Sequence, residues 1–216
     1  MGNTSVVGAT GLVGRRILEE LADRRRSAKA WIRRHTELPA GIEPFPSQVI
    51  PSSLDPFWRC DTLFVALGTT IAKAKSREAF EAVDRGLVVE CARRARAAGC
   101  GTIALVSAAG ADPRSRVFYS RVKGLAEQDV ATLGFRRVVV ARPSLLLGER
   151  EELRAGELVA RKCLGPLRRL LPRAIRPVED REVARALVVS ALDESWSGVR
   201  ILRNRDLLGR GPGLQR

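Results

Sequence analysis

Histidine is almost absent from this 216-residue chain, which contains only His35. A histidine-based metal site or a Ser-His-Asp triad would have to be built on that single residue, so we discount both. No apolar run approaches the roughly 20 residues that a membrane span needs. The first residues lack a charged and then apolar signal region, because Val6 and Val7 lead straight into a glycine-rich turn. We therefore expect a cytoplasmic protein without a membrane span.

Cysteine is also scarce, and its spacing argues against two further kinds of site. The cysteines show neither the close pairing of a zinc site nor a visible disulfide framework, and they lie in apolar segments. We predict that they are reduced thiols of the core. They are Cys60, Cys91, Cys100 and Cys163.

Acidic residues are outnumbered, with 24 Asp and Glu against 38 Lys and Arg, which gives a formal net charge of +14. A basic domain raises the possibility of nucleic-acid binding. However, the arginines are spread over many segments, and only 5% of the residues are aromatic and able to stack on bases. We favour a solvated basic surface over a nucleic-acid site. Part of the positive field would still attract an anionic cofactor.

Glycine is concentrated near the N-terminus in the turn Gly8-Ala9-Thr10-Gly11-Leu12-Val13-Gly14. An apolar, strand-like segment precedes the turn, and apolar residues at helical spacing follow it. Such a turn aims free backbone N–H groups and the positive end of a helix dipole at one point, where the glycines let a diphosphate come close. This context predicts a dinucleotide site; the alternative is a tight turn whose glycines serve packing alone. The candidate contacts are Gly8, Thr10, Gly11, Leu12, Val13 and Gly14.

Apolar segments alternate with amphipathic helical segments along the chain, which predicts a single α/β domain over residues 1–216 with a mainly parallel sheet and helices on both faces. About residues 143–216 would contribute the substrate side. The stretch 36–60 is rich in proline and serine and offers only a brief possible strand at Gln48–Ile50. Strands are expected at 28–32, 62–67, 102–106, 137–141 and 199–202, and helices at 12–23, 80–99, 119–130 and 180–191.

Two strand ends add candidate cofactor contacts. Arg33 and Arg34 follow strand 28–32, whose end faces the adenosine ribose in dinucleotide folds. An arginine there accommodates the 2′-phosphate of NADP, so we predict NADP(H), with two merely exposed arginines as the alternative. Leu67 ends the apolar strand 62–67 on the ligand side of the sheet, and Gly68 and Thr69 follow it. These residues either approach the cofactor or form a plain turn.

A tyrosine and a lysine suggest acid–base chemistry. Tyr119, the one tyrosine of the chain, and Lys123 are four residues apart and therefore project from the same helix face. A lysine ammonium close to a phenol favours the phenolate and lowers the pKa of the tyrosine, which can then exchange a proton near neutral pH. Ser107, at the end of strand 102–106, could donate a hydrogen bond to a substrate carbonyl. The alternative is an ordinary amphipathic pair.

These motifs together resemble the short-chain dehydrogenase/reductase superfamily in its extended or atypical branch, with the Tat-interacting-protein-like NADP-binding oxidoreductases as the closer match. The similarity runs over about residues 1–192. It is carried by the glycine turn, Ser107, Tyr119-Ser120-Arg121-Val122-Lys123, and several shorter segments that include Arg142-Pro143. The resemblance implies a Rossmann fold that binds NADP(H), with the nicotinamide beside Arg142 and Pro143. On the residues alone, Pro143 could equally just end a strand.

The resemblance also implies roles for the site residues. Tyr119 would be the proton donor or acceptor, Lys123 would also hold the nicotinamide ribose, and Ser107 would orient the oxygen of a small carbonyl or alcohol substrate. The chain departs from many reductases in having Asp84 where they have asparagine, and Ala108 after Ser107. A second interpretation is an NADP(H)-binding, redox-responsive regulator or assembly factor with little catalysis. Either protein would be a monomer or a homodimer.

Overall fold

The computed structural model describes residues 3–147, 172–174 and 176–208. The sequence also predicts a loop or short helix at 149–157, a helix over 158–171 and a loose tail at 209–216. These segments and Cys163 lie outside the described residues.

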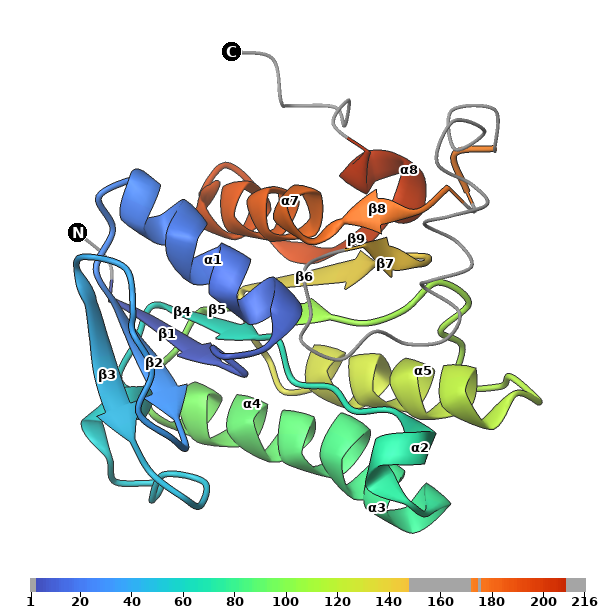
Figure 1. The fold of residues 1–216 in the computed structure, drawn as a ribbon, viewed down its shortest axis with the longest axis horizontal. Helices are drawn as coiled ribbons and strands as arrows, with labels where there is room; N and C mark the ends of the chain where they lie inside the picture. Colours follow the sequence, from blue (N-terminus) through green and yellow to red (C-terminus); the bar gives the residue numbers. More distant parts are fainter. Residues whose placement is uncertain (1–2, 148–171, 175, 209–216) are drawn as a thin grey trace.

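The described part of the chain forms a seven-stranded sheet in the order β3-β2-β1-β4-β5-β6-β9, and all neighbouring strands in it are parallel (Figure 1). This confirms the predicted doubly wound α/β fold. The chain reverses its direction of winding between β1 and β4, and ligands bind beyond the carboxyl ends of strands at such a switch point. The strands are β1 (Thr4–Val7), β2 (Ala28–Ile32), β3 (Ile42–Pro46), β4 (Thr62–Val65), β5 (Thr102–Val106), β6 (Arg137–Arg142) and β9 (Gly198–Arg203).

Helices cover both faces of the sheet. In Figure 1, α1 (Leu12–Asp23) and α7 (Asp180–Leu192) lie on one face, and α4 (Val88–Ala97) and α5 (Phe118–Ala131) lie on the other. A small second sheet pairs β7 (Leu146–Leu147) with β8 (Val178–Glu179). The shorter helical elements are η1 (Pro56–Trp58), α2 (Ile71–Ala74), α3 (Arg77–Glu81), η2 (Ala82–Leu87) and α8 (Asn204–Leu207).

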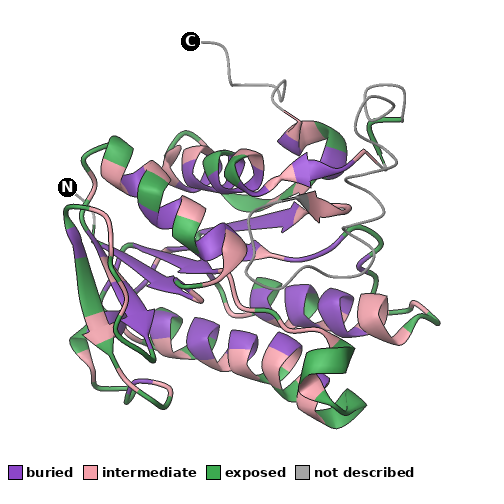
Figure 2. Ribbon diagram, viewed as in Figure 1, coloured by how far each residue is buried: buried purple, intermediate pink, exposed green. Residues whose placement is uncertain are grey.

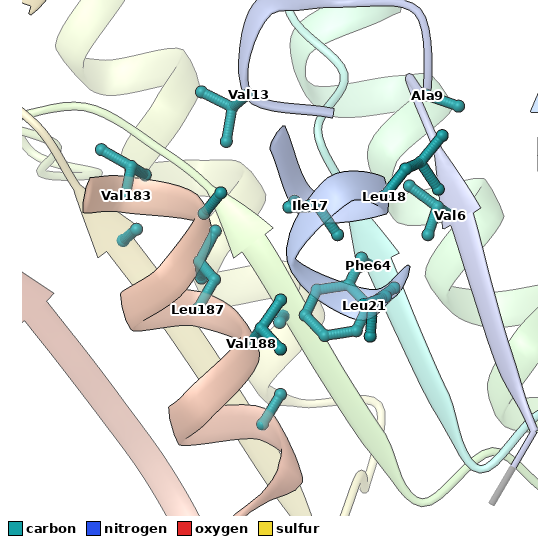
Figure 3. Packing of buried hydrophobic residues seen from close by; sticks show 14 of the residues in the cluster. Val6, Ala9, Val13, Ile17, Leu18, Leu21, Phe64, Val183, Leu187 and Val188 are labelled. Atoms are coloured by element: carbon teal, nitrogen blue, oxygen red, sulfur yellow. The ribbon is translucent and has the colours of Figure 1, made fainter. Parts of the chain in front are cut away.

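The core consists of two hydrophobic layers, one on each face of the sheet. Apolar residues recur every three or four positions along α1, so that its buried side carries Ile17 and Leu21, which pack with Leu187 and Val188 of α7 (Figure 3). The second layer lies between the sheet and α4 with α5. Figure 2 shows the same pattern, with buried residues along the strands and exposed ones on the outer sides of the helices. The two layers fix the strand ends on which the site is built.

The prediction of a strand at Gln48–Ile50 is wrong. Those residues form no strand. The stretch 36–60 contains instead the edge strand β3, which pairs with β2 from Ala28↔Ile42 to Ile32↔Pro46. Pro44 and Pro46 hid this strand from the sequence pattern, because proline interrupts an apolar run. Proline is tolerated on an edge strand, where an N–H is not needed for a second neighbour.

The helix predicted over 80–99 is present but contains a π-helical turn, η2, between α3 and α4. A π-helical turn takes in an extra residue and shifts the register of the faces. As a result the polar Asp84 is buried, with 1% of its surface exposed, while its apolar neighbour Val83 is only half-buried. The acid is thereby directed toward the strand ends.

Candidate functional site

A cavity of about 870 Å³ opens beyond the carboxyl ends of β1, β4 and β5. Its volume lies in the range of small-molecule and cofactor sites. The structure brings ten of the predicted site residues together in its wall, namely Thr10, Gly11, Leu12, Val13, Leu67, Gly68, Thr69, Ser107, Tyr119 and Lys123. The predicted residues that do not line it are Gly8, Gly14, Arg33, Arg34, Arg142 and Pro143.

Gly8 and Gly14 shape the glycine turn from behind. Gly8 has a φ of +77°, and a Cβ there would lie 2.6 Å from the backbone carbon of Ala66. A Cβ on Gly14 would lie 2.0 Å from the carbonyl oxygen of Gly8. Neither position has room for a side chain, so these two glycines let the turn press against the end of β4 and let α1 begin directly above it.

Gly11 faces the cavity at the start of α1. It is the N-cap residue of that helix, no side chain caps it, and the first turn contains no acid. The first N–H groups of a helix have no partner within the helix and carry a partial positive charge. The donors of this turn therefore suit the diphosphate of a dinucleotide.

Lys123 forms a buried ion pair with Asp84. Its Nζ atom lies 2.8 Å from Asp84 Oδ1, and the side chains are 7% and 0% exposed. The second carboxylate oxygen, Oδ2, accepts a hydrogen bond of 2.8 Å from the backbone N–H of Thr69. A single carboxylate thus compensates the lysine charge and fixes the loop after β4. The sequence marked Asp84 only as a departure from the asparagine of related reductases.

Ser107 donates its hydroxyl proton to Glu127 Oε1. Glu127 is buried and lies one helical turn beyond Lys123 on α5, and Arg142 Nε donates to both of its oxygens at 3.1 Å. A serine has one proton to donate but two lone pairs. With the proton engaged by a carboxylate, the Ser107 oxygen presents acceptor capacity to the cavity.

Arg142 and Pro143 therefore act behind the cavity wall. Arg142 holds Glu127, and the Pro143 carbonyl oxygen accepts a hydrogen bond of 2.8 Å from the N–H of Ala109. Glu127 was not recognised from the sequence. Its spacing of four from Lys123 and eight from Tyr119 is the signal that could have revealed it, because residues at these intervals share a helix face.

Tyr119 lies in the first turn of α5 and is half-buried. Its ring packs against Phe80 of α3, with 5.5 Å between the ring centroids. In the part of the chain that the structure describes, no hydrogen bond involves its hydroxyl group. The ring is thus positioned by an aromatic contact, and the phenol is available to a ligand in the cavity.

Arg16 and Asp180 close the opposite side of the cavity, and both were missed in the sequence. Arg16 Nε lies 3.1 Å from Asp180 Oδ2, which joins α1 to the start of α7. The hydrogen bonds that Arg16 donates to Glu19 and Asp180 raise the pKa of its guanidinium still further above its usual value. This arginine therefore stays charged in the wall of the cavity.

A smaller cavity of about 400 Å³ lies between α1 and residues 36–39. Arg15 lines both this cavity and the larger one, and Glu37 also lines the smaller one. Arg33 and Arg34 are exposed and line neither. The position next to the end of β2 corresponds to that of the adenosine ribose in dinucleotide folds.

Within residues 3–147, 172–174 and 176–208, no group of three or more histidine, cysteine or acidic side chains is arranged to hold a metal ion. None of the helices described there is long and apolar enough to cross a membrane.

The fold is shared with proteins whose structures were solved with bound NAD. MoeE5, solved with UDP-glucose and NAD, superposes with a TM-score of 0.73 and 18% identity, covering 93% of this chain and 75% of that chain. A short-chain dehydrogenase/reductase superfamily protein from Agrobacterium tumefaciens with bound NAD gives a TM-score of 0.65 and 14% identity over 93% of this chain and 77% of that chain. At this level of identity the likeness concerns the fold.

No protein-family model matches the chain, but several fungal proteins are similar over most of its length. "Protein fmp52, mitochondrial" of Emericella nidulans is 38% identical over 178 residues, covering 77% of this chain and 76% of its own. "Protein FMP52, mitochondrial" of Saccharomyces cerevisiae is 32% identical over 231 aligned residues, covering 99% and 98%.

These names contradict the expected cytoplasmic location, since the relatives are called mitochondrial. The expectation rested on the lack of a secretory signal region, and that criterion does not detect mitochondrial targeting, which depends on amphipathic, arginine-rich segments. The extent and identity of the matches show that the chain belongs to the family of the Fmp52 proteins.

Proposed function

We propose that this protein is an NADP(H)-dependent oxidoreductase of the short-chain dehydrogenase/reductase type, acting on a small carbonyl or alcohol substrate. The observation that supports this most strongly is the meeting of the glycine turn with Ser107, Tyr119 and Lys123 in one cavity of about 870 Å³. The sequence motifs of the chain resemble those of the Tat-interacting-protein-like NADP-binding oxidoreductases, and this resemblance favours NADP over NAD as the cofactor.

The residues present fit a dinucleotide. The uncapped N-terminus of α1 would hold the diphosphate, and Leu67, Gly68 and Thr69 would line its path toward Tyr119. When bound, the nicotinamide supplies or accepts a hydride. Arg33 and Arg34 are proposed contacts of the 2′-phosphate, and Arg15, which lines both cavities, is a third.

Side chains of the protein would carry out the proton transfer. The Tyr119 hydroxyl would exchange a proton with the substrate oxygen, and the Lys123 ammonium would stabilise the negative charge that develops on the phenol and hold the nicotinamide ribose. Ser107 would bind the same substrate oxygen. Because its proton is donated to Glu127, it accepts a hydrogen bond from an alcohol without rearrangement, whereas it must turn its hydroxyl to donate to a carbonyl.

The test is the Tyr119→Phe variant, assayed for both binding and turnover. We expect Y119F to bind NADPH within about twofold of the parent chain, because the change leaves the residues proposed for the diphosphate untouched, and to lose turnover at least about 100-fold. Turnover is followed by NADPH absorbance with a panel of aldehydes, ketones and secondary alcohols. A variant that keeps full turnover would remove Tyr119 from the chemistry.

A second candidate is an NADP(H)-binding regulator or assembly factor with little catalysis. It is favoured by the internal contacts of the site, since Asp84 compensates Lys123 and Glu127 engages Ser107. Such a protein would need the cofactor cavity but not the phenol. Y119F would then keep its biological effect, whereas a variant that no longer binds NADPH would lose it.

A further inference from the structure

Two cysteines lie side by side at the end of the sheet opposite the cavity. Strands β4 and β5 pair in register at Thr62↔Thr102, and Cys60 and Cys100 each come two residues before that pair. The backbone N–H of Thr102 donates to the carbonyl oxygen of Asp61 at 3.0 Å, so the two segments already run together here. The Sγ atoms of the two cysteines are 3.7 Å apart.

The environment makes the two thiols unequal. Cys60 is 6% exposed and Cys100 is fully buried, and Cys60 donates a hydrogen bond to Cys100 Sγ. This bond lowers the pKa of Cys100 and raises that of Cys60. Whichever sulfur is oxidised first, the other lies 3.7 Å from it and can attack it as the resolving thiol.

We propose that Cys60 and Cys100 form a reversible intramolecular disulfide when the protein meets a hydroperoxide. One of the two thiols attacks a peroxide oxygen, the O–O bond breaks, and the departing oxygen takes up the proton of that thiol and leaves as water or alcohol. The second thiol then attacks the sulfenic sulfur, the S–O bond breaks, and a molecule of water leaves with the proton of the second thiol. The two sulfurs lose two electrons in total, and the peroxide gains them.

The disulfide would close the loop from residue 60 to residue 100, which contains β4, α2, α3, η2 and α4. A bridge across a loop of this length restricts the unfolded chain and stabilises the fold. The bridge lies at the amino ends of β4 and β5, whereas the cavity lies beyond their carboxyl ends. Oxidation should therefore raise the melting temperature and leave NADPH affinity unchanged.

The experiment treats the purified full chain with hydrogen peroxide in slight excess and compares it with the chain kept in a reducing agent. The oxidised chain is expected to lose two of its four thiols in a denaturing thiol assay, and its intact mass should fall by two hydrogens. A non-reducing peptide map should show one cross-linked species, which joins the Cys60 peptide to the Cys100 peptide. A reducing agent should restore the original mass.

Cys91 provides the matched control. It lies in the same hydrophobic layer, where burial raises the pKa of its thiol to about 12, but among the described residues it makes no hydrogen bond to another thiol and so has no partner for a bridge. Cys91→Ala should form the same bridge, whereas Cys60→Ser should form none. A parent chain that keeps all its thiols, that gains oxygen without a cross-link, or that pairs Cys60 or Cys100 with any other cysteine would overturn the proposal. The thiol count, the intact mass and the peptide map of the parent chain test the proposal even if Cys60→Ser does not fold.

Discussion

Lys123 is held by Asp84, with 2.8 Å between Nζ and Oδ1 and almost no exposed surface on either side chain. Asp84 belongs to the π-helical turn η2 and Lys123 to α5, so the ion pair joins two helical elements in the wall of the cavity. In a buried ion pair each partner depends on the other, because an unpaired charge in a low-dielectric interior is very costly.

Replacing Asp84 should therefore destabilise the protein strongly. The variant D84N leaves the Lys123 ammonium buried without a counter-charge, and we expect the free energy of unfolding to fall by about 3 kcal/mol. Denaturant unfolding measures this value. The matched control is D129N, which breaks the Asp129–Arg85 pair, whose side chains are each 33% exposed. That change should cost less than about 1 kcal/mol. Equal decreases in the free energy of unfolding for D84N and D129N would show that the buried ion pair contributes no more to stability than the exposed one.

The glycine turn gives a second prediction. A methyl group at Gly14 would overlap the Gly8 carbonyl oxygen, so G14A must displace the turn. We expect NADPH affinity to fall at least about tenfold, as measured by the fluorescence of bound NADPH, and stability to fall with it. A methyl group at Gly101 would meet no heavy atom within 4 Å, so G101A should change neither quantity. Unaltered binding by G14A would argue against a diphosphate at this turn.

A third prediction concerns the choice between NADPH and NADH. If Arg15 contacts the 2′-phosphate, R15M should weaken NADPH binding about tenfold and leave NADH binding nearly unchanged, because a charge-assisted hydrogen bond is lost only with NADPH. The double variant R33M/R34M tests the other two proposed contacts, and R93M, an exposed arginine on α4, is the control. An unchanged ratio of the two affinities in R15M would exclude Arg15 from this role.

The Cys91 thiol should make stability depend on pH in the alkaline range. Its pKa is raised to about 12 by burial, whereas an unfolded cysteine ionises near about 8.5. Between these values the folded chain keeps a proton that the unfolded chain releases. The free energy of unfolding should therefore fall as pH rises above about 9, by up to about 1.4 kcal/mol per pH unit. C91A should lack this part of the slope under reducing conditions, and identical slopes for parent and variant would refute it.

Much of the fold could be predicted because its signals are local. The glycine turn lies between an apolar strand and an amphipathic helix, and Tyr119 and Lys123 are one helical turn apart. The parallel sheet then follows from the alternation of strands and helices, since carboxyl ends of parallel strands meet on one side. Ser107 was placed correctly at this side for the same reason.

The remaining features depend on contacts between distant segments. Nothing around Asp84 in the sequence shows that a π-helical turn directs it toward Lys123, and nothing around Glu127 shows that it receives Ser107 and Arg142. The adjacency of Cys60 and Cys100 likewise requires the register of two strands. Periodicity predicts which face of an element is buried, but not which polar partners meet there.

The most direct measurement is the melting temperature of the purified chain with NADPH, NADP+, NADH or NAD+ at matched concentrations. At about 100 times its Kd a ligand adds about 2.7 kcal/mol, which raises the Tm of a domain of this size by roughly 5–10 °C. We predict a rise of this order with the phosphorylated pair and a smaller one with the other pair. No rise with any of the four would contradict the assignment of the cavity to a nicotinamide dinucleotide.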